Sequence, residues 1–201
     1  MAEVRAKKAL GQHFLTDLNI ARKICDSLTE RAAGEPEAVL EVGCGMGVLT
    51  QYLLQRQDII TFGAEIDSES VEYLNAHYPD FTPRLIEGDF LKMDLRERFP
   101  DGVRVIGNFP YNISSQIFFK IIENRDLVPQ CVGMIQKEVA VRIAEPPGSR
   151  EYGILSGLLQ AWYDIEYLFT VSEKVFNPPP KVKSAVIRPP DSVRPISSRN
   201  I

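Results

Sequence analysis

A short polar and aromatic stretch, Asn108-Phe109-Pro110-Tyr111, follows an apolar run and carries the groups best suited to chemistry. The side-chain carbonyl of Asn108 can accept a hydrogen bond. So can the backbone carbonyl of Pro110, whose ring fixes the local backbone. Two such acceptors suit the two protons of an aromatic exocyclic amine, and the Tyr111 ring can stack on the base that bears it. An amine held in this way could attack a methyl group on a sulfonium, a reaction that depends on positioning and electrostatics. The alternative role for this stretch is an ordinary turn.

A glycine cluster, Glu41-Val42-Gly43-Cys44-Gly45-Met46-Gly47, lies between an expected strand and an expected helix. Gly43 and Gly45 let the backbone approach a ligand closely, because they have no Cβ. Open α/β sheets bind ligands at this place, the carboxyl end of a strand. Dinucleotide enzymes use a similar turn, so an NAD-dependent dehydrogenase is an alternative. The Asn108 stretch, however, has no part to play in hydride transfer.

Two acidic residues follow the next two expected strands. Glu65 ends one of them, and its carboxylate can accept both hydroxyls of a ribose. Asp89 follows the other and can accept a hydrogen bond from an adenine amine, while Phe90 can flank the base. The alternative role of Asp89 is a turn cap. Together with the glycine cluster, these residues predict a site for a cofactor that contains a nucleoside.

The elements that must position these groups alternate between strands and helices, which favours a parallel sheet covered on both faces. The last two strands have no helix between them and are expected to pair antiparallel. Strands are predicted at residues 38–42, 59–66, 84–86, 103–106, 131–135, 166–171 and 184–187. Helices are predicted from a cap at Thr16 or Asp17 to about Arg31, over 49–54, after a cap at Ser68, from Ser114 to Ile122, up to Ala144, and over 154–162.

The Asn-Phe-Pro-Tyr stretch fits the Asn/Asp-Pro-Pro-aromatic signature of amino-methyltransferases, and residues 108–115 resemble the form found in rRNA adenine N6,N6-dimethyltransferases of the KsgA/RsmA type. Residues 10–15 (LGQHFL) are similar to the family's N-terminal motif, which closes over the cofactor. Residues 176–186 (FNPPPKVKSAV) are similar to its FxPxPKVxSAV motif. The resemblance covers the chain from about Lys7 to Arg188. It implies an α/β, Rossmann-like class I S-adenosylmethionine-dependent methyltransferase fold, with a seven-stranded, mostly parallel sheet and an antiparallel last strand.

The resemblance also implies a role for each matching position. Asn108 and Pro110 would bind the target N6, and Tyr111 and Phe176 would sandwich the base, which must be flipped out to be reached. Phe176 could instead belong to the core. The implied cofactor residues are Gln12, His13 and Leu15 at the border, Gly43 and Gly45 at the methionine end, Glu65 at the ribose, Asp89 at the adenine amine, and Ile66, Phe90 and Asn108 nearby.

The implied reaction transfers methyl groups from S-adenosylmethionine to adenine N6 in small-subunit ribosomal RNA, with S-adenosylhomocysteine as the product and no metal. It would give N6,N6-dimethyladenosine, with a role in ribosome biogenesis. One alternative is a large-subunit rRNA adenine methylase of the macrolide-resistance type, and another is a non-catalytic ribosome assembly factor. The Pro178-Pro179-Pro180 run and the Ser184-Ala185-Val186 ending favour the small-subunit enzyme.

The composition of the 201 residues sets limits on the function. The net charge of -4 does not by itself indicate a nucleic-acid binder. Two stretches, Arg5 to Lys8 and Lys181 to Arg188, are locally basic and could be solvated surface or could contact phosphates. Three cysteines without CxxC spacing and two histidines argue against disulfides and a transition-metal site. Without an apolar membrane span or a signal peptide, we expect a cytoplasmic monomer that makes no membrane contact.

We expect residues 1–189 to form the methyltransferase catalytic domain, including the N-terminal segment that closes over the cofactor. Members of the resembled family usually continue into a small, helical, basic domain. Residues 190–201 are polar and contain proline, so we interpret them as a tail or a truncated linker to such a C-terminal helical domain.

Overall fold

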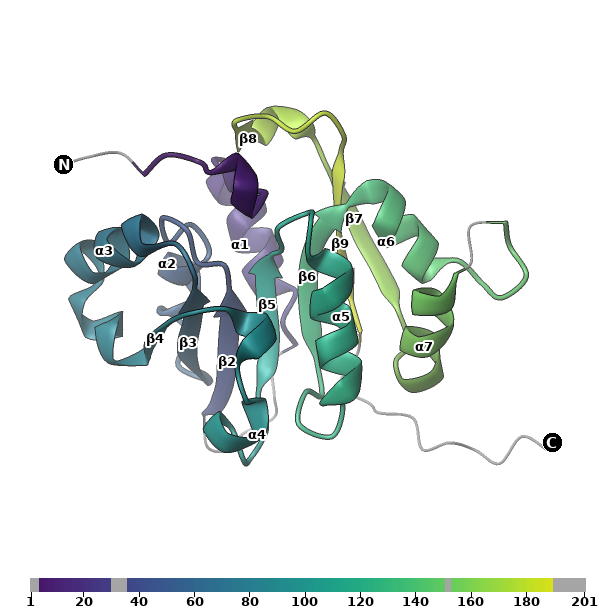
Figure 1. Ribbon diagram of the computed structural model, residues 1–201, viewed down its shortest axis with the longest axis horizontal. Coiled ribbons are helices and arrows are strands. Elements are labelled where there is room, and N and C mark those ends of the chain that lie inside the picture. The colour runs from purple at the N-terminus through teal and green to yellow at the C-terminus, as the bar shows by residue number, and fades with distance from the viewer. Residues whose placement is uncertain (1–3, 30–35, 151–152, 190–201) are drawn as a thin grey trace.

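The computed structural model describes residues 4–29, 36–150 and 153–189. A seven-stranded sheet runs through the molecule with helices on both faces (Figure 1). In sheet order its strands are β4 (Leu85–Glu87), β3 (Ile59–Glu65), β2 (Glu37–Val42), β5 (Arg104–Asn108), β6 (Cys131–Gln136), β9 (Ser184–Arg188) and β7 (Glu166–Val171). All pairs from β4 to β6 are parallel, and β9 runs antiparallel to both its neighbours. The predicted Rossmann-like class I fold is therefore confirmed.

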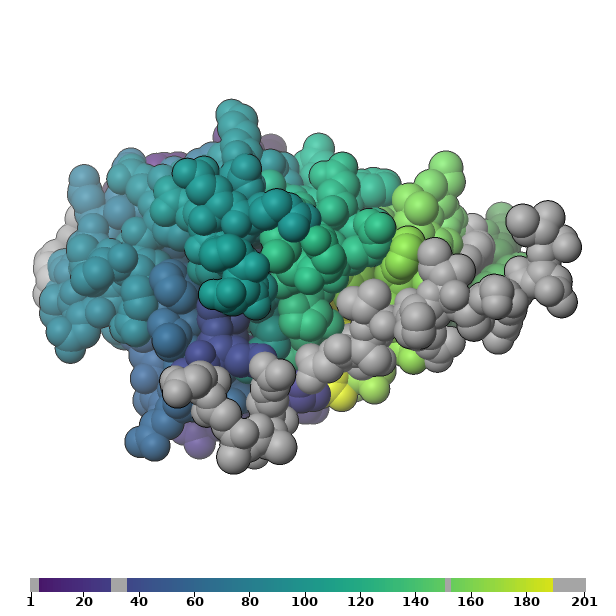
Figure 2. All heavy atoms as spheres, turned by 90° about the horizontal axis from the view of Figure 1, so that it is seen from below, coloured from purple at the N-terminus to yellow at the C-terminus, as the bar shows by residue number. Residues whose placement is uncertain are grey.

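Figure 2 shows the same arrangement from below, at the end of the molecule where the parallel strands begin. The colours run from blue on one side to yellow-green on the other, in agreement with the strand order. The first half of the chain thus forms one flank of the sheet and the second half forms the other. The two halves meet between β2 and β5, where the glycine cluster after β2 and the Asn108 stretch at the end of β5 come together.

Helices cover both faces of the sheet because its central strands are apolar on both sides. In β2, Val39 and Leu40 are both fully buried, yet they belong to separate clusters of core residues. The Leu40 cluster packs beneath α5 and α7, and the Val39 cluster packs beneath α1 and α2. The helices are α1 (Leu18–Asp26), α2 (Thr50–Leu53), α3 (Ser68–His77), α4 (Leu95–Arg98), α5 (Ser114–Glu123), α6 (Lys137–Ala144) and α7 (Ile154–Trp162).

Two helix boundaries differ from those predicted. α1 begins after Asp17, whose carboxylate accepts hydrogen bonds from two backbone N–H groups of the first turn, but it ends at Asp26, short of the predicted residue 31. The Ser27 hydroxyl donates to the Lys23 carbonyl at 2.8 Å, at the end of this helix. Ser68 is the first residue of α3 and does not cap it, because Asp67 occupies the cap position. The side chain of Asp67 makes no cap either, since its carboxylate binds other partners described below.

Residues 7–16, which we call the N-terminal arm, cross the carboxyl edge of the sheet. The arm contains a short 3-10 helix, Lys8–Leu10, and a strand, β1 (Phe14–Leu15). β1 pairs antiparallel with β8 (Phe176–Asn177), so the arm lies beside the segment that leads into β9, at the top of Figure 1. Thr16 extends this connection, because both its N–H and its hydroxyl donate to the Val175 carbonyl.

The predicted tail or linker at residues 190–201 lies outside the described residues. Within the described part of the chain, no helix combines the length and the apolar character that crossing a membrane requires.

Phe109 anchors the Asn108–Tyr111 stretch in the core. Its side chain is 1% exposed and meets the Phe118 ring edge-on at 5.8 Å. The ring fills space that exists because Gly107 and Gly133 have no side chains. A Cβ on these glycines would come within 2.9 and 2.6 Å, respectively, of ring atoms of Phe109. The second residue of the stretch is therefore a packing residue that fixes the positions of its polar neighbours.

Phe109→Ala is expected to lower the free energy of unfolding by about 3–4 kcal/mol, because the cavity it leaves is surrounded by rigid strand backbone. Phe119→Ala, on the same side of the sheet but 39% exposed, is the matched control and should cost under about 1 kcal/mol. Urea unfolding followed by circular dichroism measures both. Equal losses in the two variants would contradict the anchoring role.

Candidate active site

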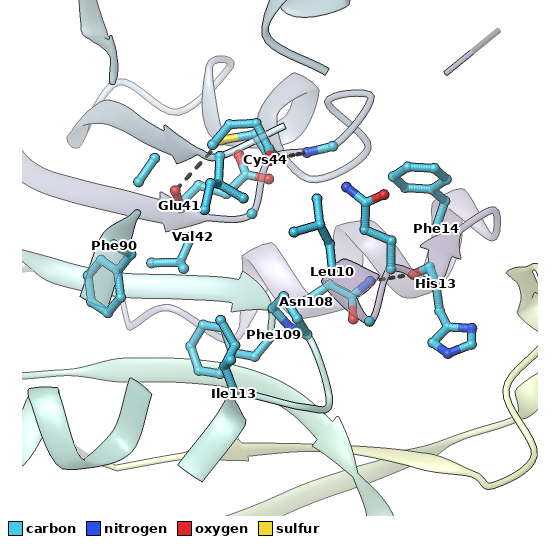
Figure 3. Close-up of a pocket in the computed structure, with 18 of the residues that line it drawn as sticks. Leu10, His13, Phe14, Glu41, Val42, Cys44, Phe90, Asn108, Phe109 and Ile113 are labelled. Atoms are coloured by element: carbon cyan, nitrogen blue, oxygen red, sulfur yellow. Dashed lines mark hydrogen bonds between the residues drawn. The ribbon is translucent and has the colours of Figure 1, made fainter. Parts of the chain in front are cut away.

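A single cavity at the carboxyl edge of the sheet brings together all but one of the site residues expected from the sequence. It lies between the glycine cluster after β2, the ends of β3 and β5, and the N-terminal arm (Figure 3). The exception is Phe176, which does not line it. The expected residues in its lining are Gln12, His13, Leu15, Gly43, Gly45, Glu65, Ile66, Asp89, Phe90, Asn108, Pro110 and Tyr111.

The Asn108 amide is oriented by the N-terminal arm. Its Nδ2 donates a hydrogen bond of 2.9 Å to the backbone carbonyl of His13, drawn as a dashed line in Figure 3. The amide has one donor end and one acceptor end, so this bond leaves Oδ1 as an acceptor. The carbonyl of Pro110 accepts the Ile113 N–H at 3.1 Å and keeps its second lone pair. The loop therefore offers two neighbouring acceptor oxygens.

Two glycines of the glycine cluster bring bare backbone to one wall of the cavity. Gly43 and Gly45 have φ values of +76° and +53°, a backbone region that favours glycine. A Cβ on Gly45 would lie 3.1 Å from the Phe14 ring, so the arm also packs against this turn. Leu10 of the arm lies between Cys44 and Asn108 in Figure 3. The sequence had not singled out Leu10 or Phe14 as cavity residues, although both belong to the recognised arm motif.

Glu65 places a buried carboxylate in the cavity. It is 3% exposed, and its two oxygens accept the N–H groups of Gly45 and Asp67 at 2.8 and 2.9 Å. Burial raises the pKa of Glu65, and hydrogen bonds from the backbone of Asp67, Gly45 and Ile66 oppose that rise. A carboxylate has about four lone-pair sites, so the group keeps capacity to accept further protons. A ribose with two adjacent hydroxyls fits this acceptor set, which is the requirement for the predicted cofactor.

Asp89 and its neighbours form the adjoining part of the cavity. One oxygen of Asp89 accepts the Leu91 N–H at 2.9 Å, and the other lies 3.8 Å from Lys92 Nζ. The turn-cap role considered for Asp89 is thus observed, and it leaves acceptor capacity on the second oxygen. Phe90 is buried beside it, and Ile66 is 52% exposed at the rim. Apolar faces next to an acceptor suit a flat base that carries an amine.

A second buried carboxylate, Glu41, was not anticipated as a site residue. It is 1% exposed, lines the cavity below the glycine cluster and accepts the Thr50 hydroxyl at 2.6 Å. Burial raises its pKa to about 8, against the opposing effect of the Thr50 hydrogen bond. Its place at the start of the glycine cluster was the sequence signal that could have identified it.

A group of polar contacts fixes the arm to the end of β3. Lys7 Nζ forms an ion pair with Asp67, and it lies 3.1 Å from a carboxylate oxygen of Glu69. The backbone N–H of Lys7 also donates to the Gln12 side chain at 2.7 Å. Burial opposes a charge on Asp67, but the hydrogen bonds from Lys7, Ser70 and Gln12 lower its pKa. Lys7 therefore binds carboxylates of its own chain and is not an uncommitted phosphate ligand.

The basic residues near the C-terminal end divide into two kinds. Arg188 is engaged within the chain, because it forms an ion pair with Glu166 at 2.6 Å and donates to the Ser27 carbonyl at 2.9 Å. Lys181 and Lys183 are exposed. Of this stretch, only the lysines keep the two roles considered from the sequence, solvated surface or phosphate contact.

Tyr111 and Phe176, the two rings expected to sandwich a base, lie in different surroundings. Tyr111 is half-buried at the cavity, with its hydroxyl 2.5 Å from the Ser184 hydroxyl and the His13 ring 5.3 Å from its own. Phe176 is 4% exposed and packs with Leu15 in the core beneath α1. The core role that the sequence left open for Phe176 is the one observed in this structure.

Within the described residues, no three His, Cys, Asp or Glu side chains gather in a way that could hold a metal ion. Cys25, Cys44 and Cys131 are all buried free thiols.

Comparison with known proteins identifies the family to which the chain is similar. Residues 3–191 match the family model described as ribosomal RNA adenine dimethylase. A protein of Parabacteroides distasonis named ribosomal RNA small subunit methyltransferase A is 61% identical over 94% of this chain and 69% of its own length. A protein of the same name from Bacteroides thetaiotaomicron is 60% identical, with the same coverage of both chains.

Two solved structures resemble the molecule in fold and sequence. The dimethyladenosine transferase from Plasmodium falciparum is 31% identical with a TM-score of 0.74, over 88% of this chain and 62% of that one. The 23S rRNA methyltransferase ErmE is 25% identical with a TM-score of 0.77, over 91% of this chain and 71% of that one. This chain thus spans somewhat over two thirds of the curated relatives quoted above and less than two thirds of the Plasmodium protein.

The buried carboxyl of Glu41 predicts a pH-dependent stability. Its pKa is about 8 in the folded protein and near the ordinary value of 4.5 when unfolded, so only the folded state holds this proton between those values. This residue therefore makes the protein less stable as the pH rises through that window. Glu41→Gln keeps an acceptor for Thr50 but cannot ionise. Its stability relative to wild type should increase from about pH 5 to pH 8, by at most about 1.4 kcal/mol per pH unit, and then level off.

Urea unfolding across this pH range measures the difference. The exposed Glu123→Gln serves as the matched control and should differ little from wild type at any pH. A Glu41→Gln difference that stays constant with pH would contradict the raised pKa.

Proposed function

Because the chain belongs to the ribosomal RNA adenine dimethylase family, we propose that it transfers methyl groups from S-adenosylmethionine to adenine N6 in small-subunit ribosomal RNA, forming N6,N6-dimethyladenosine. The observation that carries the proposal is the Asn108 amide, whose donor end is used by His13 and whose acceptor end is left for a target amine. The two relatives named small subunit methyltransferase A, at 61% and 60% identity, support the choice of ribosomal subunit.

When bound, S-adenosylmethionine supplies an electrophilic methyl group on a sulfonium. Glu65 would accept the two ribose hydroxyls, and the second oxygen of Asp89 would accept the adenine amine, between Ile66 and Phe90. The glycine backbone at Gly43 and Gly45 would adjoin the methionine end. Gln12, His13 and Leu15 would border the cofactor from the arm, next to Asn108.

The target amine would be held by the loop after β5. Asn108 Oδ1 and the Pro110 carbonyl would accept its two protons, which favours a pyramidal nitrogen whose lone pair points at the methyl carbon. Tyr111 would stack on the flipped-out base. Contact between Phe176 and the base would require a shift of the β1–β8 pair, because Phe176 is buried here. No strong base is needed, since the methylated ammonium is acidic and releases its proton to water.

The likeness to ErmE, a 23S rRNA methyltransferase, supports a second candidate: methylation of adenine in large-subunit RNA. The same loop would serve both reactions, so the choice between them depends on the RNA. Action in the cytoplasm and a monomeric state are further predictions from the sequence. The proposal includes no metal.

The direct test is transfer of a labelled methyl group from S-adenosylmethionine to small ribosomal subunits taken from a methylation-deficient strain. Large subunits are the parallel control. We expect label as dimethyladenosine in small-subunit RNA alone. Label confined to large subunits would favour the second candidate. No label on either subunit, with S-adenosylhomocysteine still raising the melting temperature, would contradict the proposed activity for this chain.

Two variants separate the roles in the same assay. Asn108→Ala should slow transfer by about 100-fold or more, because it removes an acceptor that acts on the target amine. Its affinity for S-adenosylhomocysteine should change little. Glu65→Ala should instead weaken S-adenosylhomocysteine binding by about tenfold or more. A large loss of cofactor affinity in Asn108→Ala would contradict this division, and stabilisation by NAD in place of S-adenosylhomocysteine would indicate a dehydrogenase.

A further inference from the structure

The Tyr111 ring is held at its hydroxyl end as well as at its backbone. The backbone lies in a tight turn closed by the hydrogen bond from the Ile113 N–H to the Pro110 carbonyl. At the far end, the Tyr111 hydroxyl lies 2.5 Å from the hydroxyl of Ser184. The two residues are 73 positions apart, so this contact joins the loop after β5 to β9, the last strand in chain order. A ring tethered at both ends has little freedom to turn about its side-chain bonds.

Ser184 is a rigid attachment point for this tether. It is fully buried at the start of β9, where it pairs with Gln136 of β6 on one side and Val171 of β7 on the other. Among the hydrogen bonds of the described residues, that with Tyr111 is the one made by the Ser184 hydroxyl. A buried hydroxyl without a partner would be costly, so the serine and the tyrosine satisfy each other.

Either hydroxyl can act as the donor in this bond. Burial raises the pKa of Tyr111, and the hydrogen bond with Ser184 opposes that rise only in part. The hydroxyl is therefore neutral near pH 7 and can donate to Ser184 Oγ. Replacing either hydroxyl by hydrogen removes the tether and changes little else in shape.

We propose that Ser184 is a positioning residue for methyl transfer, whose buried hydroxyl holds the Tyr111 hydroxyl and so sets the plane on which the target base stacks. The proposal rests on the function proposed above. A base that stacks on Tyr111 brings its amine to Asn108 Oδ1 and the Pro110 carbonyl only if the ring lies at the correct angle. Small displacements of reacting groups have large kinetic effects. Ser184 acts through Tyr111 and touches neither the target nor the cofactor.

A double-mutant cycle tests the proposal. Ser184→Ala and Tyr111→Phe should each lower kcat for methyl transfer about tenfold, the effect of losing one hydrogen bond that orients a reacting partner. The double variant should also be about tenfold slower than wild type and not about 100-fold slower, because each hydroxyl acts only through the other. KM for S-adenosylmethionine should stay the same in all three. Independent, multiplying effects, or no loss of kcat in Ser184→Ala, would overturn the proposal.

Ser156→Ala is the matched control for the loss of a buried serine hydroxyl. Ser156 is also fully buried, and its hydroxyl donates to the Arg142 carbonyl at 2.7 Å in contact with neither Tyr111 nor the cavity. It should lower the melting temperature without changing kcat. An equal fall of kcat in Ser156→Ala would show that lost stability, and not positioning, explains the effect of Ser184→Ala.

A spectroscopic measurement separates this proposal from the proposed function. With 3-fluorotyrosine incorporated throughout, the Tyr111 signal in the fluorine NMR spectrum is the one lost in Tyr111→Phe. Ser184→Ala should shift and sharpen that signal, since the ring is freed, and Ser156→Ala should leave it unchanged. This result requires no catalysis, so it holds even if wild type transfers no methyl group. An unchanged Tyr111 signal in Ser184→Ala would overturn the proposal, whatever the activity.

Discussion

The hydrogen bond from the Asn108 amide to the His13 carbonyl is the contact on which the rest of the site depends. An asparagine amide can turn either end toward a ligand, and only one end can accept the protons of an amine. The arm fixes the choice, because its backbone carbonyl takes the donor end. The arm is itself held by the Lys7–Asp67 ion pair and by pairing of β1 with β8. The segment that borders the cavity thus also orients the acceptor proposed for the target amine.

Packing beneath the loop complements this polar contact. The Phe109 ring packs against Gly107 and Gly133, which have no side chains and therefore leave room for it. Because Phe109 is buried, its neighbours Asn108 and Pro110 are held in place on either side of it. Two buried carboxylates lie in the part of the cavity proposed for the cofactor, and burial makes their charged forms unfavourable. Burial raises the pKa of both Glu65 and Glu41, so the cavity holds acidic groups that are unfavourable to ionise in the absence of hydrogen-bond donors. Such a site is stabilised by a ligand that brings hydroxyl groups to Glu65.

The sequence predicted the sheet well because its central strands are buried on both faces and read as continuous apolar runs. The seven strands, their antiparallel end and the grouping of the glycine cluster with Glu65, Asp89 and Asn108 all followed from local patterns. The end of α1 and the cap of α3 were predicted wrongly. For α3 a distant partner explains the difference, because Asp67 occupies the cap position and its carboxylate is engaged by Lys7.

Contacts between distant segments could not be predicted in the same way. Lys7 and Asp67 are 60 residues apart, and Tyr111 and Ser184 are 73 apart. No periodicity or motif spacing encodes such a pair, because only the folded sheet brings its members together. Phe176 shows the converse: a motif match assigns it to the base, while the β1–β8 pair buries it in the core.

The most direct test of the central claim is a crystal structure of the protein with S-adenosylhomocysteine and an RNA fragment that contains the target adenosine, whose N6 amine keeps both its protons. The account predicts N6 within hydrogen-bond distance of Asn108 Oδ1 and the Pro110 carbonyl, the base on the Tyr111 ring, and Asn108 Nδ2 still bound to the His13 carbonyl. An adenine placed outside this loop, or an Asn108 amide that has left His13 and turned its NH2 group to the target, would contradict it.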